Sequence, residues 1–93
     1  MPLTFEWNER KAASNAAKHG LKFDEDSTVF ADPLSLTIPD PAHSQKEDRF
    51  VTVGSSYRGK LLVVVYTERG DNIGIISAGL ANRRERRVYE EKH

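Results

Sequence analysis

The chain has 93 residues, of which 38% are apolar, and its 14 Lys and Arg residues balance 14 Asp and Glu residues. This size and composition fit one small domain with a modest core, and we expect residues 1–93 to form it. The absence of cysteine excludes disulfides and thiolate metal sites. No apolar run approaches the roughly 18–20 residues of a membrane span, so we expect a cytoplasmic protein with no membrane partner.

The neutral total hides an uneven distribution of charge along the chain. Residues 1–50 hold six Lys and Arg against nine Asp and Glu, a net charge of −3, whereas residues 51–93 hold eight against five, a net charge of +3. The total charge therefore does not argue for a nucleic-acid partner, but its distribution leaves one possible.

The N-terminal segment predicts a strand followed by a helix. Apolar and polar residues alternate over residues 3–7, as in a strand with one buried face. Asn8 can cap a helix over residues 9–19, and Gly20 can end it. The apolar positions of this helix are all alanine, which lets a helix lie close to a sheet.

The next segment predicts a short helix, a strand and a loop. Asp24 can cap a helix that runs to about residue 30, before the Asp-Pro pair at positions 32 and 33. Leucine and isoleucine alternate with polar residues over residues 34–38, which is typical of a half-buried strand. Residues 39–48 are polar and predict an exposed loop.

The C-terminal half predicts three strands and a basic helix. Residues 49–56 and 61–66 are rich in β-branched residues, and a turn at residues 57–59 joins them. The turn residues Gly-Asp-Asn at 70–72 lead into an isoleucine-rich strand. Asn82 can then cap a helix, with Glu85 completing a capping box.

These elements predict an α+β fold in the order β-α-α-β-β-β-β-α. Short turns between the last four strands predict a small antiparallel β-sheet meander, with the N-terminal helices on one face and a C-terminal helix at the end. We expect each of the three β-branched runs to supply core residues, namely Phe50 or Val51, Val63 or Val64, and Ile75 or Ile76.

Motifs for metals and cofactors are missing from the sequence. There is no glycine-rich phosphate loop, no HExxH motif and no ligand-like spacing of the three histidines, so we expect neither a metal nor a cofactor. Strand alternation places Tyr66 and Glu68 on one face and Arg69 on the other, and we expect the closing helix to bring Arg83 near this strand end. Such a group could transfer protons and stabilise a phosphorane, or it could be an ion pair at the sheet edge.

The basic C-terminal helix admits two interpretations. Arg83, Arg84 and Arg86 lie in its first turns, where the positive end of the helix dipole disfavours cations. They form either a solvated charged face or a binding surface for phosphates or an acidic partner.

Five segments together resemble the BrnT family of type II toxins. They are FEWNERKAASNAAKHG, FDEDSTVFADPLSLTIPD, DRFVTVG, LLVVVYTERGDNIGIISA and NRRERRVYEE, and they cover almost the whole chain. The resemblance implies a RelE-like fold and a ribonuclease toxin that inhibits translation by cleaving RNA without a metal. It also implies a BrnA-type antitoxin with a ribbon-helix-helix domain, and contact with operator DNA only through the toxin–antitoxin complex.

The resemblance also implies roles for the candidate site residues. Glu68 becomes the candidate base, Arg69 and Arg83 the charge stabilisers, and Tyr66 a proton donor or stacking surface. His19 is a further catalytic candidate. The residues expected to bind RNA are Arg49, Arg84 and Arg86.

The chain departs from the family pattern in one segment. Members of the family usually read close to IRIISARKAT, whereas this chain reads IGIISAGLAN. Gly74, Gly79 and Leu80 thus stand where basic residues are expected, which predicts weaker RNA binding and weaker cleavage. The alternative function is a weakened or inactive toxin fold that serves mainly as antitoxin partner and co-repressor. A third possibility, a small-molecule enzyme, lacks a cofactor motif.

Overall fold

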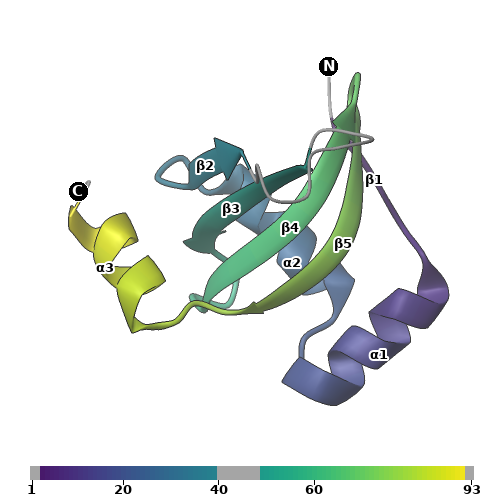
Figure 1. The fold of residues 1–93 in the computed structure, drawn as a ribbon, viewed down its shortest axis with the longest axis horizontal. Coiled ribbons are helices and arrows are strands. Elements are labelled where there is room, and N and C mark those ends of the chain that lie inside the picture. The colour runs from purple at the N-terminus through teal and green to yellow at the C-terminus, as the bar shows by residue number, and fades with distance from the viewer. Residues whose placement is uncertain (1–2, 40–48, 92–93) are drawn as a thin grey trace.

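The computed structural model describes residues 3–39 and 49–91 as a five-stranded sheet with helices around it (Figure 1). In chain order the elements are β1 (Thr4–Trp7), α1 (Glu9–His19), α2 (Phe23–Ser27), the 3-10 helix η1 (Thr28–Ala31), β2 (Leu36–Pro39), β3 (Arg49–Ser55), β4 (Leu61–Arg69), β5 (Asn72–Leu80) and α3 (Arg83–Glu91). The mixed α+β class is confirmed. Of the loop expected at residues 39–48, only Pro39 is described, and it is the last residue of β2. Residues 40–48 lie outside the described residues.

The strand order of the sheet is β1-β5-β4-β3-β2. The pairs β2–β3, β3–β4 and β4–β5 are antiparallel, so the meander expected of the last four strands is confirmed. The first strand corrects the picture of a wholly antiparallel sheet, because β1 pairs with β5 in parallel. A parallel pair needs a long connection, and here residues 8–71 lie between the two strands.

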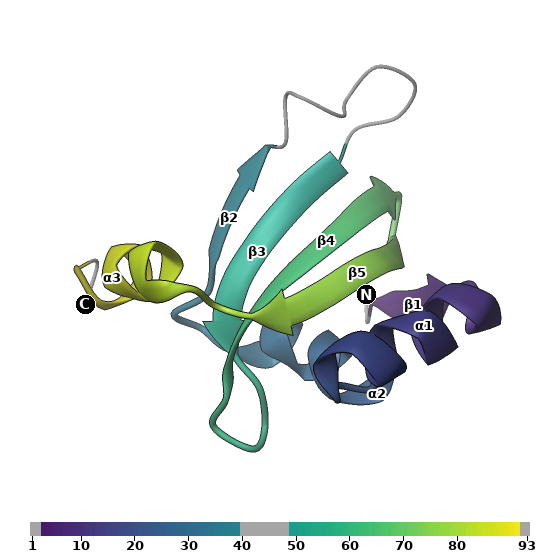
Figure 2. The same cartoon turned by 60° about the horizontal axis from the view of Figure 1, so that its bottom comes forward.

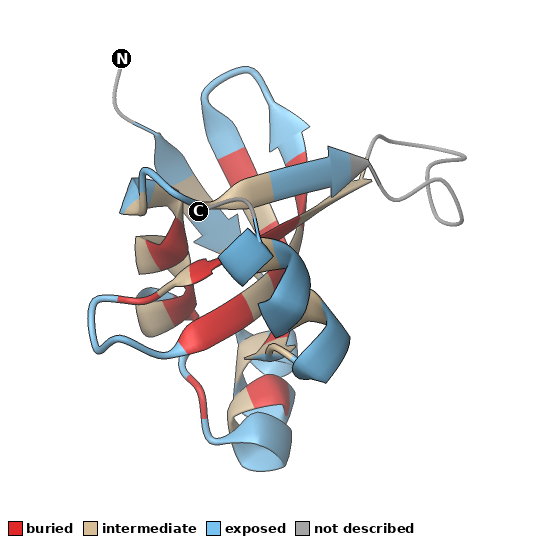
Figure 3. Ribbon diagram, turned by 90° about the vertical axis from the view of Figure 1, so that its left-hand side faces the viewer, coloured by how far each residue is buried: buried red, intermediate tan, exposed pale blue. Residues whose placement is uncertain are grey.

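One face of the sheet packs against α2 and η1 and holds the hydrophobic core. Figure 3 colours the buried residues red. The buried core residues are Leu21, Phe23, Val29, Leu62, Val64, Tyr66, Ile73, Ile75 and Ala78, with Phe50 packed against them. Each β-branched run therefore supplies a core residue as its pattern predicted. The helix α2 begins at Phe23, whose side chain is buried, and Asp24 lies within the helix instead of capping it.

Helix α1 lies along the outer edge of β5 instead of covering a face (Figure 2). Its ends follow the predicted signals, since Asn8 caps the first turn and Gly20 adopts a left-handed conformation with φ of 69°. The helix is anchored by Asn15, whose side-chain oxygen accepts a 3.2 Å hydrogen bond from the backbone N–H of Ala78. Because alanines make up its apolar side, α1 can approach the strand closely.

A β-bulge in β5 marks the point where its neighbour changes. Tyr66 pairs with Ile75 and Val65 pairs with Ser77, so Ile76 has no partner on β4. The pairing of β1 with β5 ends at Ile75, and α1 lies beside the strand beyond this point. The bulge therefore accommodates the transition from a strand neighbour to a helix neighbour.

Strand β2 starts two residues later than the alternation predicted. The Asp32 side chain accepts a hydrogen bond from the backbone N–H of Leu34, which holds residues 32–35 in a turn. Leu34 is consequently exposed, and the strand begins at Leu36. This local turn competes with strand formation in the way that aspartate side chains commonly do.

Helix α3 begins with the predicted capping box, and a hydrogen bond near its end ties it to the segment before β2. Asn82 and Glu85 exchange reciprocal hydrogen bonds of 2.8 and 2.7 Å between side chains and backbone N–H groups. The Tyr89 hydroxyl donates a 2.7 Å hydrogen bond to Asp32, and partial burial with this bond raises the pKa of Tyr89 to about 12. No residue of α3 is buried.

Within the described ranges, no helix is long and apolar enough to cross a membrane.

The core contains one acidic side chain without a hydrogen-bond partner. Asp26 on α2 is fully buried, and neither of its carboxylate oxygens is hydrogen-bonded within the described part of the chain. Burial raises the pKa of Asp26 from 3.8 to about 7, and the neighbouring Glu25 carboxylate adds to the rise. Between these two values the folded state binds a proton that the unfolded state does not, so stability falls as the pH rises.

Replacing Asp26 with asparagine removes this dependence. Asp26→Asn is expected to gain stability over the unchanged chain, and the gain should be about 3 kcal/mol larger at pH 8 than at pH 5. Urea unfolding of both chains at the two pH values measures it. Asp24→Asn, an exposed change on the same helix, is the control and should show no such dependence. If the free energy of unfolding depended on pH equally in Asp26→Asn and in the unchanged chain, the raised pKa of Asp26 would be contradicted.

Candidate functional site

We call the face of the sheet turned away from α2 and η1 the open face. It carries polar and charged side chains near the end of β4 at Arg69, and valines of β3 and β4 further along these strands. Side chains alternate along a strand, so the residues next to core residues point to this face. On β4, Thr67 and Arg69 therefore lie on the open face, because Tyr66 belongs to the core. Arg49 on β3 pairs with Thr67 and shares its face.

The edge strand β1 adds a carboxylate to the open face. Phe5 and Trp7 pack against the core, so Glu6 between them points to the other face. Glu6 is exposed, and its side chain makes no hydrogen bond or ion pair with any residue in the ranges 3–39 and 49–91.

A hollow of about 510 Å³ lies on the open face. Its lining comes from β1, α1, β3, β4 and β5 and consists of Glu6, Trp7, Asn8, Lys11, Arg49, Thr67, Arg69, Gly74, Ile75 and Ile76. Three of these side chains are cations and one is a carboxylate. The hollow is thus suited to an anion that also presents a proton donor.

A second hollow of about 350 Å³ adjoins the first, since Lys11 and Ile76 line both. Its remaining lining is Ser14, Asn15, Lys18, His19 and Ser77. We call the two hollows together the trough, which follows β5 beside α1.

One side of helix α1 forms the wall of the trough. Lys11, Ser14, Asn15 and Lys18 are spaced three or four residues apart and therefore lie on one helical face. Asn15 in the middle of this face is bound to the backbone of β5. The contact that holds the helix in place therefore also directs its cations toward the trough.

Three of the residues singled out from the sequence line the trough, but only two of them lie close together. His19 lies beside Gly79, which pairs with Val63, six residues away from Arg69 on β4. Arg49 and Arg69 line the first hollow, and His19 lines the second. They come from β3, β4 and the end of α1 and are separated by as many as 50 positions in the chain.

Tyr66 lies in the core and not in the trough. It is 2% exposed, and its ring packs against Phe30 and Phe50 with centroid distances of 4.8 and 5.8 Å. Its hydroxyl accepts a 3.0 Å hydrogen bond from Thr52. A group in this position supports the fold and has no access to a substrate on the open face.

Glu68 and the arginines of α3 lie apart from Arg69. Glu68 pairs with Ile73 and points to the core side of the sheet, where it is exposed at the strand end. Helix α3 follows Ala81, whose backbone N–H bonds to Leu61 at the start of β4. Since β4 is nine residues long, its two ends are about 25 Å apart, and the expected approach of Arg83 to the end of β4 does not occur.

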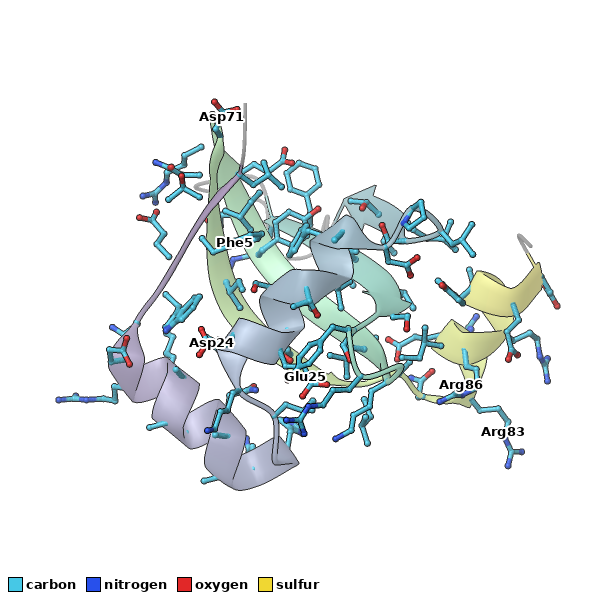
Figure 4. All side chains as sticks on the ribbon, turned by 180° about the vertical axis from the view of Figure 1, so that it is seen from behind. Phe5, Asp24, Glu25, Asp71, Arg83 and Arg86 are labelled. Atoms are coloured by element: carbon cyan, nitrogen blue, oxygen red, sulfur yellow. The ribbon has the colours of Figure 1, made fainter. Side chains whose placement is uncertain are left out.

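Figure 4 shows this separation, with Asp71 at the tip of the β4–β5 hairpin and Arg83 and Arg86 at the other end of the molecule. Arg83, Arg84 and Arg86 are all exposed and line neither hollow. They form a separate basic surface.

Sequence reasoning missed Glu6, Lys11 and Lys18 as site residues. Glu6 was one polar position of an alternating strand, and neither lysine of the first helix was singled out. Their spacing carried a usable signal, because Lys11, Asn15 and Lys18 share a helical face with little apolar character. What it could not show was the strand beside which that face lies.

The three positions that depart from the family pattern have different surroundings. Gly74 and Gly79 lie on the open face, whereas Leu80 pairs with Leu62 and belongs to the other face, where it is 62% exposed. A Cβ at Gly79 would lie 3.6 Å from the His19 ring, which is ordinary contact, but one at Gly74 would lie 2.8 Å from the Thr67 hydroxyl. Thr67 therefore partly occupies the space that a side chain at position 74 would need.

The trough can bind a phosphodiester and stabilise added negative charge on it. Guanidinium and ammonium groups aimed at one phosphate lower the free energy of a phosphorane. Within the described ranges no three His, Cys, Asp or Glu side chains are grouped so as to hold a metal ion.

Comparison with known proteins identifies a family and a similar fold. Residues 7–85 match the family described as "Ribonuclease toxin, BrnT, of type II toxin-antitoxin system". The fold is similar to the crystal structure of the Brucella abortus ribonuclease toxin BrnT, with a TM-score of 0.68 and 24% identity, over 87% of this chain and 99% of that one. No curated protein sequence matches the chain.

Removing the buried hydroxyl of Tyr66 tests its structural role. Tyr66→Phe is expected to lower the free energy of unfolding by about 1 kcal/mol, because it leaves the Thr52 hydroxyl without this acceptor. Urea unfolding measures the change. The matched control is Tyr57→Phe, since Tyr57 is 67% exposed and its hydroxyl accepts a hydrogen bond from Arg58 at the surface. Equal effects of the two changes would contradict a role of Tyr66 in the core.

Proposed function

Because the chain belongs to the BrnT family of type II toxin–antitoxin ribonuclease toxins, we propose that its trough binds and cleaves single-stranded RNA without a metal ion. The observation that carries the proposal is the first hollow, whose lining includes the cations Lys11, Arg49 and Arg69 and one exposed carboxylate, that of Glu6. Cleavage by attack of the RNA's own 2′-hydroxyl needs a base, and cations for the phosphorane, and this hollow offers both.

The cations have distinct tasks in this proposal. Arg49 and Arg69 hold the oxygens of the scissile phosphate from two neighbouring strands, and Lys11 approaches it from the helix. Lys18 and His19 contact the next phosphate along the trough. Thr67 and Gly74 form a floor without long side chains, so that the RNA backbone can approach the sheet.

The basic surface of α3 has a different task. Helix α3 starts beside the end of β4 that is about 25 Å from Arg69, so Arg83, Arg84 and Arg86 are too far away to touch the scissile phosphate. They can bind a flanking part of the same RNA through its phosphates, which adds affinity without contributing to the chemical step.

Membership of a type II toxin–antitoxin family implies an antitoxin partner. We expect a BrnA-type antitoxin with a ribbon-helix-helix domain, and we expect operator DNA to be bound by the complex through that domain. Cleavage of messenger RNA would inhibit translation and would place the activity in the cytoplasm. The relation to RelE-type ribonucleases remains a prediction.

Arginine substitutions in the first hollow test the site. Arg49→Gln and Arg69→Gln are each expected to slow RNA cleavage about 10²–10³-fold, because each removes one charge that stabilises the phosphorane. The assay uses toxin released from its antitoxin complex and RNA in EDTA. Arg10→Gln is the matched control, since Arg10 is exposed on α1 and lines neither hollow. Loss of cleavage in EDTA, or an equal loss in Arg10→Gln, would contradict the proposal.

Restoring basic residues tests the effect of the two glycines. Gly79→Arg is expected to strengthen RNA binding and to steepen its salt dependence by about 0.7 in log–log slope, the value for one added phosphate contact. Gly74→Arg alone should destabilise the fold unless Thr67→Ala makes room for it. Binding is measured with RNA blocked by 2′-O-methyl groups.

Leu80→Lys is the control for added charge, because Leu80 lies on the other face of the sheet. An equal gain from Leu80→Lys and Gly79→Arg would show that the trough is not where RNA binds.

A further inference from the structure

Four residues form a continuous row across the open face of the sheet. Glu6 on β1 pairs with Gly74 on β5, Gly74 pairs with Thr67 on β4, and Thr67 pairs with Arg49 on β3. Neighbouring strands are about 4.8 Å apart, so the backbones of Glu6 and Arg49 are separated by about 14 Å. The row therefore has a carboxylate at one end, a guanidinium at the other and two small residues between them.

The middle of this row is a recess and its ends are charged. Gly74 has no side chain, and the Thr67 side chain is short and 93% buried, with 7% of its surface exposed. Glu6 and Arg49 line the same hollow as Arg69, which lies two residues beyond Thr67 on the same face. The two small residues leave space for a group held between opposite charges.

The Glu6 carboxylate does not neutralise the nearby cations. It forms no ion pair with Arg49, Arg69 or Lys11, although all four side chains line one hollow. A carboxylate that only stabilised the fold would gain most by pairing with one of these groups. Here the carboxylate and the cations border the same space from different elements.

We infer that Glu6 is the general base of the cleavage reaction, an assignment that rests on the proposed function. The scissile phosphate lies over Thr67 and Gly74 with its oxygens on Arg49 and Arg69. Its ribose lies toward β1, where the 2′-hydroxyl meets Glu6. Glu68, which the resemblance suggested as base, points to the opposite face of the sheet and does not meet this phosphate.

The reaction balances without any further cofactor. The Glu6 carboxylate accepts the 2′-hydroxyl proton as the 2′-oxygen forms a bond to phosphorus. The bond from phosphorus to the 5′-oxygen breaks, and this oxygen takes a proton from solvent water. The products are a 2′,3′-cyclic phosphate and a 5′-hydroxyl, and Glu6 returns its proton to solvent.

The test compares the same substitution on the two faces of the sheet. Glu6→Gln is expected to lower kcat about 10²–10⁴-fold, the range for loss of a general base. Its binding of 2′-O-methyl RNA should be unchanged or tighter, because a negative charge has been removed from the trough. Glu68→Gln, an equally conservative change on the other face, should keep the kcat of the unchanged chain.

A second substrate separates the role of base from that of acid. In RNA with a 5′-thio leaving group, the sulfur departs as a thiolate and needs no proton. This substrate therefore restores the rate of a variant that lacks the acid, but not of one that lacks the base. Glu6→Gln should therefore remain as impaired on this substrate as on ordinary RNA. Recovery of its rate would overturn the assignment of Glu6 as base.

The remaining outcomes distinguish the assignment from the proposed function. If the unchanged chain cleaves RNA and Glu6→Gln cleaves it equally well, the assignment is wrong and the function stands. If Glu68→Gln alone loses activity, the base lies on the other face and the assignment is also wrong. Failure of the unchanged chain to cleave RNA, with its antitoxin removed, overturns both the function and the assignment.

Discussion

The outer edge of β5 is the constraint on which the rest of this structure depends. An uncovered strand edge exposes backbone hydrogen-bonding groups that must find partners or water. In this chain β1 pairs with the edge as far as Ile75. Beyond the bulge, the Asn15 side chain accepts a hydrogen bond from the backbone N–H of Ala78. Two consecutive elements, β1 and α1, thus cover one strand.

This edge also determines where charged groups can gather. Because β1 is held in register against β5, Glu6 lies in line with Gly74, and because Asn15 anchors α1, Lys11 and Lys18 lie beside the same strand. The trough exists since this helix lies beside the sheet and does not cover its open face. The core is correspondingly one-sided, and α2 and η1 supply its cover.

The distribution of charge in the folded molecule differs from its distribution along the chain. The N-terminal half has the net negative charge, yet it contributes Lys11, Lys18, His19 and Arg49 to the trough. The basic C-terminal helix, which attracts attention in the sequence, lies at the other end of β4 from Arg69. Charge totals over segments say little about a site when that site combines side chains from five elements.

The sequence by itself determined the local structure. The alternation in β1, the caps Asn8 and Gly20, and the Asn82–Glu85 capping box are interactions between near neighbours, and they form as predicted. The β-branched runs likewise determined the meander and its core, because each burial pattern is contained in one strand and short turns set the pairing. The family resemblance, which depends on local motifs, was confirmed for the same reason.

Only the tertiary structure decided which face each candidate residue occupies and what lies beside it. The parallel pairing of β1 with β5 joins segments more than 60 residues apart, and no local pattern encodes its register. That register places Glu6 in the same row across the sheet as Arg49. The antiparallel path of β4 and β5 carries Arg83 away from Arg69. Tyr66 and Arg69 are three residues apart in the chain but lie on opposite faces, because one side chain packs into the core and the other does not.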